Sequence, residues 1–120
     1  MKRLILAFAL SGFFATPAMA NGVDHFKGLP AETLEQAVAN FSEYNQRLSV
    51  VLAGEIDNQA MTEVHELTYT LENALEKIHL EVAELVDTLE DLHVASETYD
   101  ADKVKAKGDA YLSVATALVK

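Results

Sequence analysis

Apolar residues recur at alternating spacings of three and four along most of the chain, the pattern of amphipathic helices. The first series follows Pro30 and stops before Gly54, and these residue types favour the first turn and the end of a helix. Its apolar positions are Leu34, Ala37, Phe41, Tyr44, Leu48 and Val51. The pattern predicts a first helix from about Pro30 to Gly54.

A longer series follows Asp57 and Asn58, either of which can cap a helix. Its apolar positions are Met61, Val64, Leu67, Leu71, Ala74, Ile78, Val82, Leu85, Leu89 and Leu92. No Gly or Pro occurs from Ile56 to Tyr99, so we expect one helix of ~40 residues and ~60 Å. Two consecutive spacings of four residues, from Ala74 to Ile78 and from Ile78 to Val82, interrupt the alternation. They predict a point over 79–81 where the helix can bend or break. A break there would give four helices instead of three.

The last series begins after residues 98–100, where Asp100 is suited to cap a helix. Its inner positions are Val104, Gly108, Tyr111, Ala115 and Leu118. Glycine inside a helix costs about 1 kcal/mol relative to alanine, so Gly108 predicts a close approach to a neighbouring helix. The three helices predict an all-α antiparallel bundle in which the two shorter helices cover one half each of the long helix.

The two short helices leave much of the long apolar stripe without cover. Large exposed apolar surfaces usually mark places where proteins associate. We therefore expect a homodimer through the second helix.

The first 20 residues have the three parts of a cleavable signal peptide. Lys2 and Arg3 precede an apolar run over 4–14, and the small-residue sequence Ala18-Met19-Ala20 ends the segment. The apolar run is about half as long as the ~20 residues of a membrane-spanning helix, so we expect cleavage and no anchor.

This pattern divides the sequence into a signal peptide over 1–20, a short leader over 21–29 and one helical domain over 30–120. The leader contains Gly22 and Gly28 and is expected to be poorly ordered except where Phe26 packs. We expect the mature protein in the periplasm or outside the cell, with no membrane contact after cleavage.

The charge of the mature part is strongly negative. From Asn21 onward there are 7 basic and 19 acidic residues, a formal net charge of −12. Nucleic acid and anionic lipid surfaces are therefore excluded as partners, whereas cations and cationic proteins are favoured. The sequence contains no cysteine, which excludes disulfides, thiolate metal sites, amino-terminal lipidation and covalently attached haem.

Two Glu-x-x-His motifs lie in the long predicted helix, Glu76 with His79 and Glu90 with His93. Each motif places a carboxylate and an imidazole on one helical face, as in di-iron carboxylate bundles. The motifs are ~21 Å apart on one continuous helix, so only a dimer or a helix break brings them together. Glu76, His79, Glu90 and His93 are thus candidate metal ligands. The alternative is ordinary helix surface, since two-residue patterns often arise by chance.

Catalytic chemistry has no candidate residues in this sequence. The serines fall within helical patterns and lack a glycine-rich elbow, and no phosphate-binding glycine loop is present. We expect no enzyme activity and no cofactor.

Exported four-helix b-type cytochromes are similar in size and helix pattern, but their ligands have no counterpart. Such cytochromes bind haem with an early methionine and a histidine of the last helix. Met61 is the only methionine after Ala20, and no histidine occurs over 100–120. Ligation by two of the four histidines stays open, although no spacing favours it. These are His25, His65, His79 and His93.

The segments Val23–Pro30 and His65–Leu75 resemble an uncharacterised family of small exported proteins of Gram-negative bacteria. The resemblance spans nearly all of the mature chain. It implies a signal peptide and a helical domain of unknown function, and it brings no ligand or catalytic residue. We therefore predict a non-enzymatic interaction or structural module that acts through an exposed helical surface. The alternative is a periplasmic bundle that binds a metal or, less readily, haem.

Overall fold

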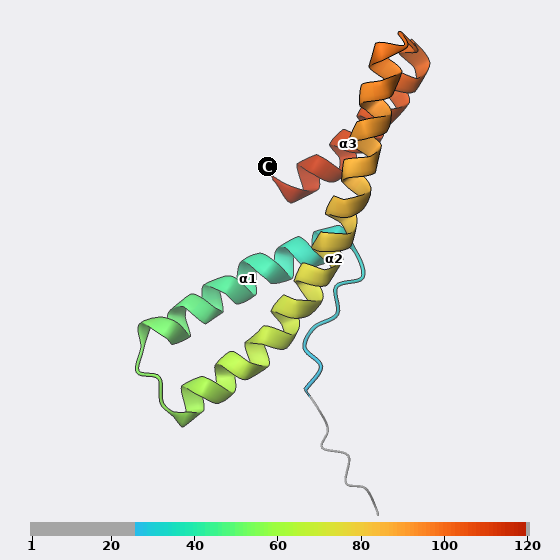
Figure 1. The fold of residues 1–120 in the computed structure, drawn as a ribbon. Helices are drawn as coiled ribbons and strands as arrows, with labels where there is room; N and C mark the ends of the chain where they lie inside the picture. Colours follow the sequence, from blue (N-terminus) through green and yellow to red (C-terminus); the bar gives the residue numbers. More distant parts are fainter. Residues whose placement is uncertain (1–25, 120) are drawn as a thin grey trace, which may run out of the picture.

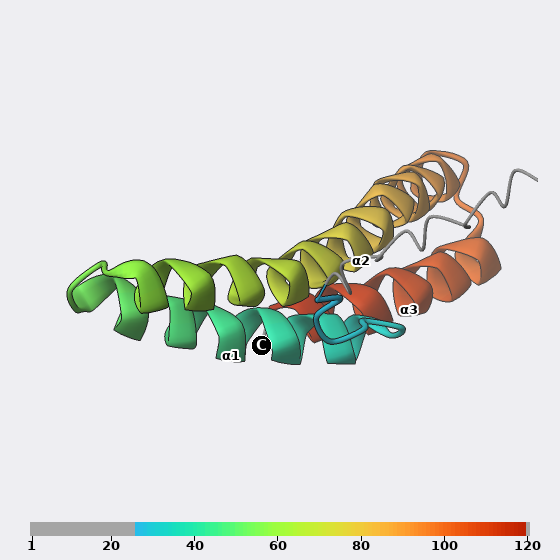
Figure 2. The same cartoon turned by 90° about the horizontal axis from the view of Figure 1, so that it is seen from below.

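The computed structural model describes residues 26–119, and the predicted signal peptide lies outside this range. The described residues form three helices and no strand: α1 (Leu34–Ala53), α2 (Asn58–Glu97) and α3 (Ala101–Leu118). α1 folds back along the first half of α2, and α3 returns along its second half (Figure 1). The two shorter helices follow one another along the same side of α2 (Figure 2). The predicted all-α antiparallel bundle is confirmed.

The long helix α2 runs without interruption for 40 residues, so the alternative with four helices is wrong. Its axis changes direction near its middle (Figure 1). The spacing shift at Ile78 lies in this part of the helix. The shift therefore coincides with a bend and leaves the helix unbroken.

The start of α1 differs from the prediction. The helix begins at Leu34 and not at Pro30. The hydroxyl of Thr33 accepts a hydrogen bond from the Gln36 backbone N–H at 3.2 Å, and the Gln36 side chain accepts from the Thr33 N–H at 3.4 Å. This capping box satisfies N–H groups at the helix end and so decides where the helix begins.

The other two helices begin at aspartate caps. Asp57 accepts a hydrogen bond from the Ala60 N–H at 2.8 Å, so Asp57 and not Asn58 is the cap of α2. Asp100 accepts from the Lys103 N–H at 3.0 Å and caps α3, as predicted.

Most of the core lies between the first half of α2 and the first turns of α1. The buried residues of this part are Leu34, Ala37, Leu67, Thr70, Leu71 and Ala74, and Ala95 is also buried near the end of α2. The predicted apolar stripe is correct in this part. Outside it, Met61, Val82 and Leu89 stay 53, 39 and 46% exposed. Burial on α2 is therefore most continuous over residues 67–74, and Ala95 is the one buried α2 residue outside this range within the described part of the chain.

An extended segment, residues 26–31, lies across the middle of α2, and we call it the leader strap. The Leu29 N–H donates to the hydroxyl of the fully buried Thr70 at 2.9 Å. The Asn73 side-chain amide donates to the carbonyls of Lys27 and Leu29 at 3.0 and 2.9 Å. The expected poor order is therefore wrong for this described part of the leader.

Two further contacts fix the leader strap on α2. The Phe26 ring packs on Tyr69 with 6.0 Å between the ring centroids, as the sequence predicted for a packing Phe26. Gly28 has φ of +70°, and a Cβ there would lie 2.6 Å from the Thr70 backbone nitrogen. Only glycine fits this position, because any larger residue clashes with the α2 backbone.

Gly108 does not mark the close helix approach that the sequence predicted. A Cβ at this position would have Leu92 Cδ1 as its nearest neighbour at 3.9 Å, an ordinary van der Waals distance. An ion pair joins the two helices close by: Lys107 Nζ of α3 donates to Asp91 Oδ2 of α2 at 2.5 Å.

None of the described helices has a stretch long and apolar enough to cross a membrane.

The two glycines give a matched test of the leader strap. We expect Gly28→Ala to lower the free energy of unfolding by about 2–3 kcal/mol, because of the clash and the positive φ. Gly108→Ala is expected to raise it by about 0.5–1 kcal/mol, because the space is free and alanine favours helix. Urea unfolding followed by circular dichroism measures both. Equal stability of the Gly28→Ala protein and the wild type would show that the strap does not hold the fold.

The ion pair between Lys107 and Asp91 predicts a lowered pKa for Asp91. The hydrogen bond and positive charge of Lys107 lower the pKa of Asp91 from its ordinary 3.8. Because the folded-state pKa is the lower one, the pair stabilises the fold above the unfolded-state pKa, and this contribution is lost as pH falls through the folded-state pKa. We expect NMR titration to show a lowered Asp91 pKa that returns toward 3.8 in Lys107→Met.

Lys105→Met is the control, because Lys105 pairs with Asp109 within α3. An Asp91 pKa that is the same in wild type and Lys107→Met would contradict the pairing.

Candidate functional site

The second half of α2 carries an apolar series that neither α1 nor α3 covers. It consists of Leu75, His79, Val82, Val86, Leu89 and His93, and we call it the outer seam. Its spacings of four and three repeat without a break, which is the a/d spacing of a coiled coil. Its four apolar side chains are 39–63% exposed, and both histidines are exposed.

The sequence analysis identified only part of the outer seam. It placed Val82 and Leu89 on the inner stripe and assigned no role to Leu75 or Val86. The regular spacing over 75–93 was the signal available in the sequence. Two apolar series run side by side on this half of the helix, and periodicity alone does not show which one α3 covers.

The four predicted metal ligands lie on or beside the outer seam. His79 and His93 are members of it, and all four side chains belong to exposed residues. Because α2 is continuous, Glu76 and His79 remain about 21 Å from Glu90 and His93. Among residues 26–119, no three histidine, aspartate or glutamate side chains are close enough to hold a metal ion. One chain therefore does not bring the two motifs together, and the metal site stays a prediction.

The histidines have different partners in this structure. His93 Nε2 lies 3.2 Å from Glu97 Oε1, one turn further along α2. His65 packs edge-on against Tyr69, with 5.1 Å between ring centroids and 3.4 Å between its Nε2 and the Tyr69 hydroxyl. His25 lies outside the described residues.

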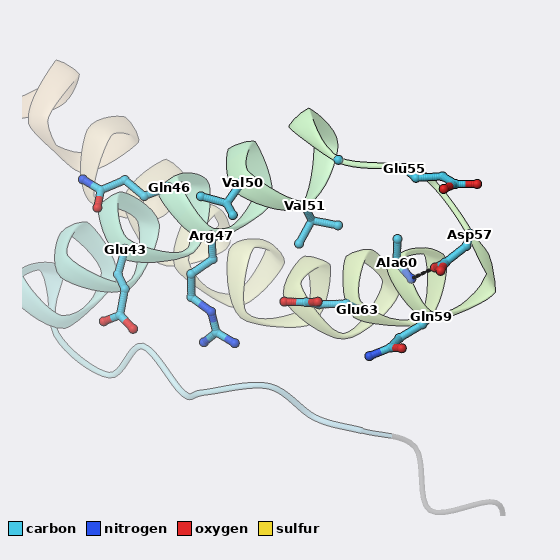
Figure 3. Close-up of a pocket in the computed structure, with 11 residues that line it drawn as sticks. Glu43, Gln46, Arg47, Val50, Val51, Glu55, Asp57, Gln59, Ala60 and Glu63 are labelled. Carbon is cyan, nitrogen blue, oxygen red and sulfur yellow. Dashed lines mark hydrogen bonds between the residues drawn. The ribbon is translucent and has the colours of Figure 1, made fainter.

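A second surface lies at the hairpin end, where α1 passes into α2. A groove of about 620 Å³ runs between the last turns of α1 and the first turns of α2 (Figure 3). Val51 and Ala60 point toward each other from the two helices, and Val50 lies beside them (Figure 3). We call this the hairpin groove. The sequence analysis did not identify it, because it depends on the angle between the two helices.

Carboxylates surround the hairpin groove. Glu43 and Glu63 lie on its two helices, and Glu55 lies in the connecting loop (Figure 3). Within the described residues, none of these three takes part in an ion pair. The one basic residue of the lining, Arg47, lies with its guanidinium carbon 4.6 Å from the Tyr44 ring centroid. The groove therefore combines an apolar floor with a net negative border.

The shifted pKa values belong to residues outside both surfaces. A hydrogen bond from Lys77 to Glu81, with 2.5 Å between Nζ and Oε1, raises the pKa of Lys77. The lowered pKa of Asp91 arises from Lys107, as described above. These lysines neutralise carboxylates away from the outer seam and the hairpin groove.

Comparison with known proteins gives one match. The model of a family of unknown function, DUF6746, matches residues 1–120. Neither a curated protein nor a solved structure matches the chain. The predicted membership of an uncharacterised family is confirmed, whereas the match does not bear on a Gram-negative origin or on similarity to cytochromes.

Proposed function

Because the chain belongs to the family of unknown function DUF6746, its function has to be inferred from its own surfaces, and we propose a non-enzymatic interaction module. It is exported by the segment over residues 1–20 and associates with a second copy of itself through the outer seam of α2. The observation that carries this proposal is the heptad spacing over 75–93, in which four of the six exposed positions are apolar and two are histidines.

The heptad spacing supports a helix as the partner. A strict 3.5-residue repeat keeps an apolar seam facing one neighbouring helix along its whole length. A second copy of α2 offers the same repeat, and α1 and α3 pack on a different side of the helix. Because the outer seam spans about five turns, a second copy covers more than one of its apolar residues at once.

An antiparallel pairing matches the residue types of the outer seam. With Val86 opposite Leu89 of the second copy, Val82 lies opposite His93 of that copy, and the arrangement is the same from either chain. Two-fold symmetry of this kind is usual in homodimers.

Electrostatic repulsion opposes the association. Glu76, Glu90 and Glu97 follow one edge of the outer seam, and the second copy brings the same charges. Salt screens repulsion between exposed charges, so a rise in ionic strength is expected to strengthen the dimer.

A pair of valines tests the dimer. Val86 is a central residue of the outer seam, whereas Val94 is exposed on the same helix outside it. We expect wild type and Val94→Lys to form dimers at tens of micromolar in sedimentation velocity, and Val86→Lys to raise the dissociation constant at least ten-fold. A wild-type protein that stays monomeric, or a Val94→Lys protein as weak as Val86→Lys, would contradict the proposal.

Transition-metal binding is the second candidate function, and the position of the histidines favours it. In the antiparallel pairing, His93 of the second copy lies about 4.5 Å along the helix axis from His79. Glu76 is one turn from this His79, and Glu97 of the second copy is one turn from its own His93. The dimer thus brings together imidazoles and carboxylates that one chain keeps apart, a donor set suited to zinc.

Zinc titration at two pH values tests this second function. We expect binding near pH 7 that weakens below about pH 6, because a ligating imidazole has to be neutral and histidine titrates near ~6.5. His79→Ala with His93→Ala should abolish it, whereas His65→Ala, which removes a histidine outside the outer seam, should not. Identical calorimetric binding by the double mutant and wild type, or no binding below about 100 μM, would exclude these ligands.

A further inference from the structure

The hairpin groove lies beside the connection between α1 and α2. This connection is at the opposite end of the molecule from the connection between α2 and α3 (Figure 1). Exposed apolar side chains also occur in the last turn of α1, the connecting loop and the first turn of α2, although only Val50 among them lines the groove. Those with more than 45% exposure are Val50, Leu52, Ile56 and Met61. The groove therefore has an apolar lining from Val50, Val51 and Ala60, and further apolar side chains are exposed at the same end of the molecule.

The charge around the groove is predominantly negative. Over residues 34–75 there are seven acidic residues and only one basic residue, Arg47. The last turn of α1 contains no basic residue, so the negative end of its helix dipole also stays uncompensated at this end. At the start of α2, Asp57 caps the positive end and offsets its charge.

We propose that the hairpin groove binds an amphipathic helix with basic flanks, contributed by another protein. The apolar face of this helix enters between Val50 and Ala60, and its lysines or arginines reach Glu43, Glu55 and Glu63. Grooves between two helices bind amphipathic helices in this way. The three carboxylates fix the sign of the partner's charge, because within the described residues no lysine or arginine forms an ion pair with them.

Two other occupants fit the groove less well. A second copy of this chain would bring its own acidic residues against the acidic border, and only one basic residue lies in the whole hairpin. A small polycation would pair with the carboxylates but would leave the apolar floor exposed. A basic amphipathic helix satisfies both features.

Fluorescence anisotropy with synthetic peptides tests this binding. The probe is a labelled 18-residue helical peptide (~5 turns) with leucine on one face and lysine on the other. A leucine/glutamate peptide of the same pattern tests the charge, and a serine/lysine peptide tests the apolar face. All measurements use Val86→Lys protein, in which the outer seam carries a charge. Because this variant is designed not to dimerise through the outer seam, the peptide measurement does not depend on the proposed dimer. A lack of peptide binding therefore counts against the hairpin groove alone.

Two pairs of matched variants locate the binding site. Glu43→Gln with Glu63→Gln removes two charges at the groove, and Glu84→Gln with Asp87→Asn removes two charges on the distant half of α2. Val50→Ser removes an exposed groove side chain, and Val94→Ser removes an exposed valine elsewhere. Circular dichroism confirms that each variant is folded.

We expect the leucine/lysine peptide to bind at least ten-fold more tightly than either other peptide. Each groove variant should weaken its binding at least five-fold, and each distant variant less than two-fold. Equal weakening by the distant pair would mean general charge attraction, and equal binding of the serine/lysine peptide would mean a site for polycations. Either result, or no binding of the leucine/lysine peptide below about 1 mM, overturns the proposal.

Discussion

The length of α2 is the constraint on which the rest of this structure depends. A helix of 40 residues extends ~60 Å, and it has only α1, with 20 residues, and α3, with 18, to cover it. Placed one after the other, the two shorter helices match the length of α2 but cover only one side of it. The core is consequently narrow, and it is best developed over residues 67–74 of α2, where α1 and the leader strap pack.

Polar contacts hold that middle region together. Thr70 is completely buried, and a buried hydroxyl needs a hydrogen-bond partner, which the Leu29 N–H provides. Asn73 binds two further backbone carbonyls of the leader strap, and Gly28 lets the strap backbone reach α2. The core thus combines a few buried leucines and alanines with the leader strap. The strap is held at Thr70 and Asn73 by hydrogen bonds of its backbone.

Both proposed interaction surfaces exist because α1 and α3 cover α2 incompletely. α3 packs on one side of the second half of α2 and leaves the outer seam exposed, while the diverging ends of α1 and α2 form the hairpin groove. Carboxylates border both surfaces, and a high negative charge opposes nonspecific association of apolar surfaces. A specific partner therefore has to supply either the same heptad repeat or the opposite charge.

The sequence by itself determined the three helices, their order and the cap Asp100, because helical periodicity and capping are local properties. For the second helix it left two caps open, Asp57 and Asn58. It also identified Glu76, His79, Glu90 and His93 as residues on helix faces. Only the tertiary structure decided that α2 bends without breaking, that Gly28 and not Gly108 is the glycine of a close approach, and that Val86 faces outward. These features depend on which residues meet across the fold, and the angles between helices are not encoded in the spacing of any one helix.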